Sequence, residues 1–186
     1  MEYADIYTAQ RERTGRIAER GSSLGEGEYR LIVHAAIFNR AGELLIQQRQ
    51  PFKKGWGGLW DLTVGGAVSA GETSAQALVR ELQEELGITW DLRGEPQAVT
   101  LTFDHGFDDI YLLRGEVDIS SLRLQPEEVA DAKWAAREEV FAMLADGRFV
   151  PYHEGLIDLL FAMREKTDGL KEQSGEKVRR STETTP

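Results

Sequence analysis

Apolar residues fall into short runs that are separated by polar, glycine-containing turns. The run Tyr29–Phe38 predicts a buried strand, Asn39–Gly42 a turn, and Glu43–Gln48 a partner strand, so this region is expected to form a hairpin. Further strands are expected at 59–64, ending at Gly65–Gly66, at 98–103, at 110–117, and in a short segment that ends at Trp134.

The segment Thr73–Leu86 has the apolar spacing of a helix. Ala75, Leu78, Leu82 and Leu86 recur every three or four residues and would face the core. Residues 72–74 supply capping side chains at its start, and Gly87 stands where a left-handed C-cap is commonly glycine. Two more helices are expected at 138–145 and 154–164.

This order of elements predicts one α/β domain, a sandwich in which helices cover both faces of a mixed sheet. Residues 1–28 are polar and rich in glycine, and they are expected to form an N-terminal extension that is irregular or a hairpin. The domain is expected to span 29–166. From 167 to 186 the chain has almost no apolar residues, which predicts a disordered tail.

Composition excludes several classes of function. The chain of 186 residues has 22 Lys+Arg and 32 Asp+Glu, a formal charge of −10. This balance disfavours general nucleic-acid binding, although a local basic cluster could still bind a small phosphorylated ligand. Without cysteine there is no disulfide and no thiolate nucleophile or ligand. Neither a signal-like start nor a long apolar run is present, which predicts a cytoplasmic protein that does not enter the membrane.

The predicted helix carries an unusual cluster of carboxylates. The sequence reads Gly66-x5-Glu72-x7-Arg80-Glu81-Leu82-x-Glu84-Glu85-x-Gly87-Ile88. At about 100° per residue, Glu84 and Glu85 lie about 60° and 40° to either side of Glu81. Such carboxylates repel one another, and hard cations such as Mg²⁺ or Mn²⁺ would offset the repulsion and bridge to substrate phosphates. The alternative is a solvated acidic helix face, but a match at seven identities and two aliphatic positions arises by chance on the order of once in a million.

This segment resembles the Nudix box, G-x5-E-x7-R-E-U-x-E-E-x-G-U with U aliphatic, at every defining position. The resemblance implies an α/β/α sandwich and Mg²⁺-dependent hydrolysis of a diphosphate joined to another moiety, usually a nucleoside. It implies that Glu81, Glu84 and Glu85 bind metal, while Gly66, Glu72 and Arg80 support their geometry. Homodimers are common among proteins of this kind.

The resemblance also implies a mechanism. Bound cations would neutralise the diphosphate and lower the pKa of a water, which would attack phosphorus in line. A carboxylate outside the box often acts as a base or as an extra ligand. Glu128, with its neighbour Glu127, and Asp109 are the candidates, and plain loop acidity is the alternative for each.

A basic cluster precedes the box. Arg49, Lys53 and Lys54 could bind the diphosphate, or they could merely keep a loop soluble. Of the two tryptophans in this region, Trp56 could stack on a base, whereas Trp60 at a strand position is expected in the core. His34 is expected to be a hydrogen-bonded structural histidine.

The run from His34 to Gly66 also resembles isopentenyl-diphosphate isomerase, a Nudix-fold enzyme. That isomerase moves protons with a cysteine and a glutamate and binds metal largely through histidines. Here Gly65 stands in place of the cysteine, and Arg30 and Ala67 stand in place of two of the histidines. The sequence therefore favours a hydrolase of a nucleoside diphosphate derivative or a related small diphosphate. An isomerase-like enzyme and a non-catalytic nucleotide sensor are the alternatives.

Overall fold

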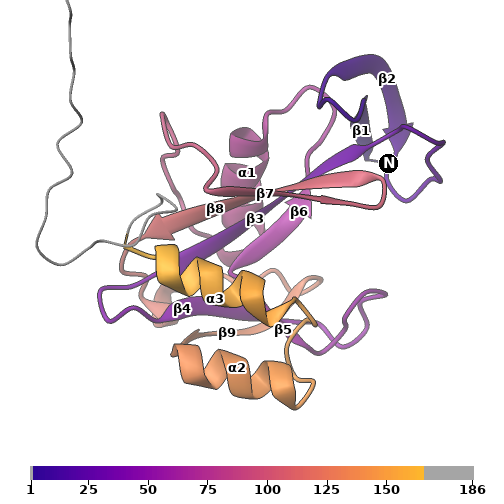
Figure 1. The fold of residues 1–186 in the computed structure, drawn as a ribbon. Coiled ribbons are helices and arrows are strands. Elements are labelled where there is room, and N and C mark those ends of the chain that lie inside the picture. Colours follow the sequence, from indigo (N-terminus) through magenta and orange to yellow (C-terminus); the bar gives the residue numbers. More distant parts are fainter. Residues whose placement is uncertain (1, 166–186) are drawn as a thin grey trace, which may run out of the picture.

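The computed structural model describes residues 2–165, and the predicted tail at 167–186 lies outside them. A seven-stranded mixed sheet forms the centre of the fold (Figure 1). Strands β1 (Tyr3–Tyr7) and β2 (Arg13–Glu19) form a separate sheet. The central sheet contains β3 (Arg30–Phe38), β4 (Leu44–Arg49), β5 (Trp60–Asp61), β6 (Val64–Ala67), β7 (Val99–Phe103), β8 (Gly106–Arg114) and β9 (Val129–Ala135). The helices are α1 (Ser74–Leu86), α2 (Arg137–Ala145) and α3 (Glu154–Met163), with a short 3₁₀ turn at Ile119–Ser121.

Strand β3 organises the sheet. It pairs in parallel with β8 over its whole length and antiparallel with β4 and β6. The order is β5-β4-β3-β8-β7, with β6 added beside β3 and β9 beside β4. The near-continuous apolar sequence of β3 fits this central place, because a strand covered on both faces has no need of a polar face.

Each face of the sheet has its own core. On one face, Val33 and Ala35 of β3 pack with the buried leucines of α1. On the other face, Ala36 and Phe38 pack with α2 and α3, and the rings of Phe38 and Phe161 meet at 5.1 Å. Figure 1 shows α1 on one side of the sheet and α3 on the other. The predicted α/β/α sandwich is confirmed.

Helix α1 begins and ends as its sequence indicates. The Thr73 side chain accepts a hydrogen bond from the Gln76 backbone, and the Gln76 side chain accepts one from the Thr73 backbone. This capping box satisfies amides that would otherwise lack partners at the helix start. Gly87 closes the helix in the left-handed conformation, with φ of 70°.

Two strand predictions need correction. The single strand expected at 59–64 is divided into β5 and β6, and Gly65 and Gly66 lie inside β6, where they pair with His34 and Val33. Strand β8 begins at Gly106 rather than at Ile110. The prediction was wrong because Asp108 and Asp109 are polar, and yet they lie buried within the strand. Polar partners supplied by distant segments make this burial tolerable.

The N-terminal extension is a hairpin. Strands β1 and β2 form their own two-stranded sheet beside the loop that leads into α1 (Figure 1). The hairpin is held to the loop before α1, because the Ala70 amide donates to the Tyr3 carbonyl and Arg13 donates to the Glu72 carbonyl. No helix in residues 2–165 has the length and apolar character needed to cross a membrane.

Candidate active site

A small polar cavity of about 110 Å³ opens where α1, β6 and the N-terminal hairpin meet. Three of its lining residues are the carboxylates Glu81, Glu84 and Glu85 of α1. The others are Glu2, Arg20, Arg49, Lys53, Gly65, Arg80, Gln125 and Glu128. The structure thus brings together most of the residues that the sequence singles out, although they are far apart along the chain.

Arg80 connects carboxylates of α1 with Glu72, which lies in the loop before the helix. Its guanidinium donates to both oxygens of Glu72 at 3.0 Å, to Glu81 at 2.8 Å and to Glu84 at 3.1 Å. It also donates to the Ala67 carbonyl, which ties α1 to the end of β6. The hydrogen bond from Arg80 lowers the pKa of Glu72, and the pKa of Arg80 is raised in turn. This network orients the carboxylates before any cation binds.

Gly66 makes room for Glu81. A Cβ at position 66 would collide with the Glu81 carboxylate, so only glycine allows this close approach of strand and helix. Burial raises the pKa of Glu81, and the hydrogen bond from Arg80 opposes that shift. The sequence predicts a supporting role for Gly66, and its contact with Glu81 gives that role a physical basis.

Glu85 is the most deeply buried of the three carboxylates. It is 5% exposed, and burial raises its pKa to about 8. Its Oε2 accepts a hydrogen bond from Gln47 at 2.9 Å, which opposes the shift. The other polar atom of that side chain, Gln47 Oε1, is buried without a hydrogen-bond partner. Burial disfavours the charged form of this carboxyl, and a bound cation would offset that cost.

These residues suit a hard divalent cation. All three carboxylates line one cavity, and they supply only oxygen donors. Within residues 2–165, no three acidic or histidine side chains already converge as a finished metal site. Arg80 holds Glu81 and Glu84 in the present arrangement, so a bound cation would take over part of its bonding.

The basic cluster divides in two. Arg49 and Lys53 line the cavity, whereas Lys54 is exposed in the loop and is not part of the lining. Arg49 lies 3.4 Å from Asp61 and donates to the Gly55 carbonyl, which fixes its direction. Two of the three predicted diphosphate-binding residues therefore face the carboxylates.

The two candidate bases differ in position. Glu128 lines the cavity and forms an ion pair with Lys53. Asp109 does not line it: this side chain is 1% exposed and is bound by Arg11 at 2.8 Å and by Thr100 at 2.7 Å. These contacts give Asp109 the partners of a structural carboxylate and leave Glu128 as the candidate in the cavity.

Three cavity residues, Glu2, Arg20 and Gln125, were not predicted from the sequence. Glu2 and Arg20 pair at 2.6 Å across the ends of β1 and β2, and Gln125 lies in the loop before β9. No local pattern marks these residues, because only the docking of the hairpin onto the loop before α1 brings them to the cavity.

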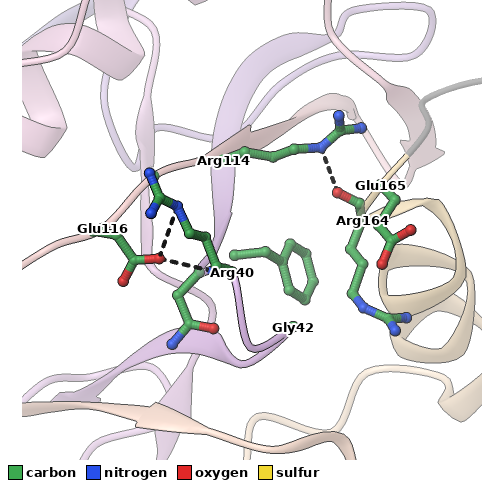
Figure 2. Close-up of a pocket in the computed structure, with 9 residues that line it drawn as sticks. Arg40, Gly42, Arg114, Glu116, Arg164 and Glu165 are labelled. Atoms are coloured by element: carbon green, nitrogen blue, oxygen red, sulfur yellow. Dashed lines mark hydrogen bonds and ion pairs between the residues drawn. The ribbon is translucent and has the colours of Figure 1, made fainter.

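A second cleft, of about 430 Å³, lies at the far end of β3 and β8 (Figure 2). Arg40, Arg114 and Arg164 surround it together with Glu116 and Glu165. Arg114 donates to the Arg164 carbonyl at 2.5 Å, and Glu116 accepts from the Arg40 amide at 2.9 Å. Arg114 thus caps the C-terminal end of α3, where a cation is favourable, and the cleft lacks the clustered carboxylates of the first cavity.

Comparison with known proteins agrees with this geometry. Residues 28–160 match the NUDIX domain family. An uncharacterized Nudix hydrolase of Listeria monocytogenes, lmo0368, is 44% identical over 167 residues, which are 90% of this chain and 98% of that protein. The isopentenyl-diphosphate Delta-isomerase of Escherichia coli (strain K12 / DH10B) is 26% identical over 147 residues, 75% of this chain and 79% of that enzyme.

The fold has solved counterparts as well. The crystal structure of DR0079 from Deinococcus radiodurans superimposes with a TM-score of 0.68 and 24% identity, covering 86% of this chain and 97% of that one. This likeness concerns the fold, while the family match and the Listeria relative concern the sequence. The chain therefore belongs to the Nudix hydrolases, which act on diphosphate bonds.

Proposed function

We propose that this enzyme is a Mg²⁺-dependent hydrolase that cleaves the diphosphate linkage of a nucleoside diphosphate derivative or a related small diphosphate. The observation that carries the proposal is the single cavity in which three α1 carboxylates face Arg49 and Lys53. Carboxylates for a cation and cations for a diphosphate are the two requirements of this chemistry. Mn²⁺ would suit the same oxygen donors.

In this proposal, Glu81, Glu84 and Glu85 hold the metal, and the bound metal would lower the pKa of the attacking water and neutralise the diphosphate. Arg80 keeps Glu81 and Glu84 oriented, and Gln47 does the same for Glu85.

Arg49 and Lys53 bind the diphosphate oxygens. An incoming diphosphate competes for Lys53, and Glu128 is then free to take a proton from water.

The isomerase alternative has less support. The Escherichia coli isomerase is a relative, but this chain has no cysteine, and Gly65 occupies the corresponding position. A Cβ at position 65 would collide with the His34 ring, so a cysteine side chain could not be placed there unless His34 moved. The non-catalytic alternative is disfavoured because every acidic position of the box retains its glutamate.

The test is phosphate release, measured with a coupled phosphatase. The panel contains nucleoside di- and triphosphates, nucleotide sugars, dinucleoside polyphosphates and ADP-ribose, each with Mg²⁺, Mn²⁺ or EDTA. We expect turnover of at least one class with Mg²⁺ and none with EDTA. Binding without turnover in either metal would contradict the proposal and favour a sensor.

A further inference from the structure

A chain of buried and partly buried polar side chains lies beside the cavity, on the sheet face that carries α3. His34 Nδ1 is 2.8 Å from Asp108 Oδ1, and His34 Nε2 is 3.5 Å from the Tyr152 hydroxyl. That hydroxyl donates to Asp61 Oδ1 at 2.8 Å, and Asp61 Oδ2 is 3.4 Å from Arg49. We call His34, Asp108, Tyr152 and Asp61 the polar cluster.

The polar cluster interrupts a sheet face that is otherwise apolar. Neighbouring positions on the same face, Ala36, Ile110 and Leu112, are apolar and pack in the core beneath α3. The side chains of His34, Asp108 and Asp61 are only 14%, 9% and 8% exposed. Burying two carboxylates and an imidazole is less favourable than packing apolar side chains of similar size, so a purely structural role explains the polar cluster poorly.

The polar cluster approaches the cavity at two of its members, Asp61 and His34. Asp61 contacts Arg49, which lines that cavity. His34 pairs with Gly65 across β3 and β6, and its ring occupies the space that a side chain at position 65 would need. Gly65 itself lines the cavity, so one glycine residue separates the His34 ring from the metal side. A moiety attached to a diphosphate at Arg49 would therefore lie within reach of the polar cluster.

Two atoms of the polar cluster keep unused hydrogen-bonding capacity. At 3.5 Å, the contact from His34 Nε2 to Tyr152 is at the limit of a hydrogen bond. Asp108 uses Oδ1 for His34, and the described residues supply no hydrogen bond to Oδ2. The pKa of His34 is raised: burial alone would lower it, and the hydrogen bond and charge of Asp108 outweigh that effect. A protonated ring would donate from both nitrogens, so the polar cluster presents a donor and an acceptor side by side.

We infer that the polar cluster is a subsite for the moiety joined to the diphosphate, and that it selects a moiety with hydrogen-bonding groups over an apolar prenyl chain. The shared chemistry is an O–H or N–H donor for Asp108, supplied by sugar hydroxyls or by the amino group of a base. An alkenyl chain would leave buried polar atoms unpaired, and such a loss makes polar sites selective. This inference rests on the proposed hydrolase function.

The test compares three diphosphates that differ in the attached moiety. A nucleoside diphosphate sugar adds hydroxyls, and a diphosphate joining two nucleosides adds a second base. Isopentenyl diphosphate has an attached moiety without a donor and is tested as a competitive inhibitor. For His34→Phe and Asp108→Asn we expect kcat/KM on at least one donor-bearing substrate to fall tenfold or more, mainly through KM. The Ki of isopentenyl diphosphate should stay within about twofold or decrease.

Matched controls separate selectivity from folding. His153→Phe changes an exposed histidine beside Tyr152 and should alter none of these constants. Asp108→Asn keeps the shape of the side chain, so it answers the question if His34→Phe fails to fold. A loss confined to the sugar substrate assigns the contact to hydroxyls, and a loss confined to the dinucleoside assigns it to a base. Equal losses on all three ligands, or no loss on any of them, would overturn the subsite.

Failure of the proposed function has a different signature. If the parent protein hydrolyses neither substrate, calorimetry with the same three ligands still measures the subsite. Retained selectivity without turnover would reject hydrolysis and support the subsite. If the protein hydrolyses its substrates and the two variants keep the parental ratio of kcat/KM to the Ki of isopentenyl diphosphate, the subsite is rejected and hydrolysis is supported.

Discussion

The buried carboxyl of Glu85 should make the metal-free protein less stable as the pH rises. Glu85 is 5% exposed, and burial raises its pKa from the usual 4.5 to about 8. In the unfolded chain this carboxyl ionises near pH 4.5, whereas in the folded protein it keeps its proton up to about pH 8. Folding therefore takes up a proton between these values, and each pH unit lowers the free energy of unfolding by about 1.4 kcal/mol.

The magnitude follows from the width of this interval. From pH 5 to pH 7, Glu85 should lower the stability of the metal-free protein by about 3 kcal/mol, and by about 5 kcal/mol over the whole interval. Its contribution is fully present below pH 4.5, where both states are protonated, and it is lost by about pH 8. In Glu85→Gln the neutral amide removes this contribution, so the variant should gain on the parent as pH rises.

The assay is urea unfolding in EDTA at about one-unit steps from pH 5 to above pH 8. The stability difference between Glu85→Gln and the parent should grow with pH and level off above pH 8. Glu138→Gln changes an exposed glutamate on α2 and should follow the parent at every pH. Parallel pH curves for the parent and Glu85→Gln would refute the claim that this carboxyl is protonated in the metal-free fold.

Two further substitutions test the cavity. Lys53→Gln should lower kcat/KM about tenfold or more through loss of a charge-assisted phosphate contact, whereas Lys54→Gln, one residue outside the cavity, should match the parent in steady-state kinetics. Equal effects of the two lysines would show that only general charge matters. Gly66→Ala should displace Glu81 and weaken Mg²⁺ binding at least tenfold by calorimetry, and Gly55→Ala, where a Cβ meets open space, should not. Parental Mg²⁺ affinity in Gly66→Ala would contradict the packing argument.

The sequence predicts the local features of the fold well. Helix α1 follows from its leucine spacing and from caps at Thr73 and Gly87, all of which lie within one segment. The acidic face of α1 follows from the same periodicity, and the structure places it in a cavity.

Features that depend on distant partners escape sequence reasoning. Gly65 and Gly66 suggest a strand end, yet β3 pairs with both of them and their missing side chains make room for His34 and Glu81. Arg20 gives no sign in the sequence that it lines the cavity, because docking of the hairpin brings it there.

The most direct test of the central claim is the kcat/KM of Glu84→Gln with Mg²⁺ on the best substrate of the panel, measured beside Glu138→Gln. Glu84 lines the cavity and is half exposed, so its replacement by glutamine removes a charge without opening the core. We expect Glu84→Gln to lose at least a hundredfold in kcat/KM while Glu138→Gln stays at the parental value and both remain folded. Parental activity in folded Glu84→Gln would show that the α1 carboxylates are not the metal site.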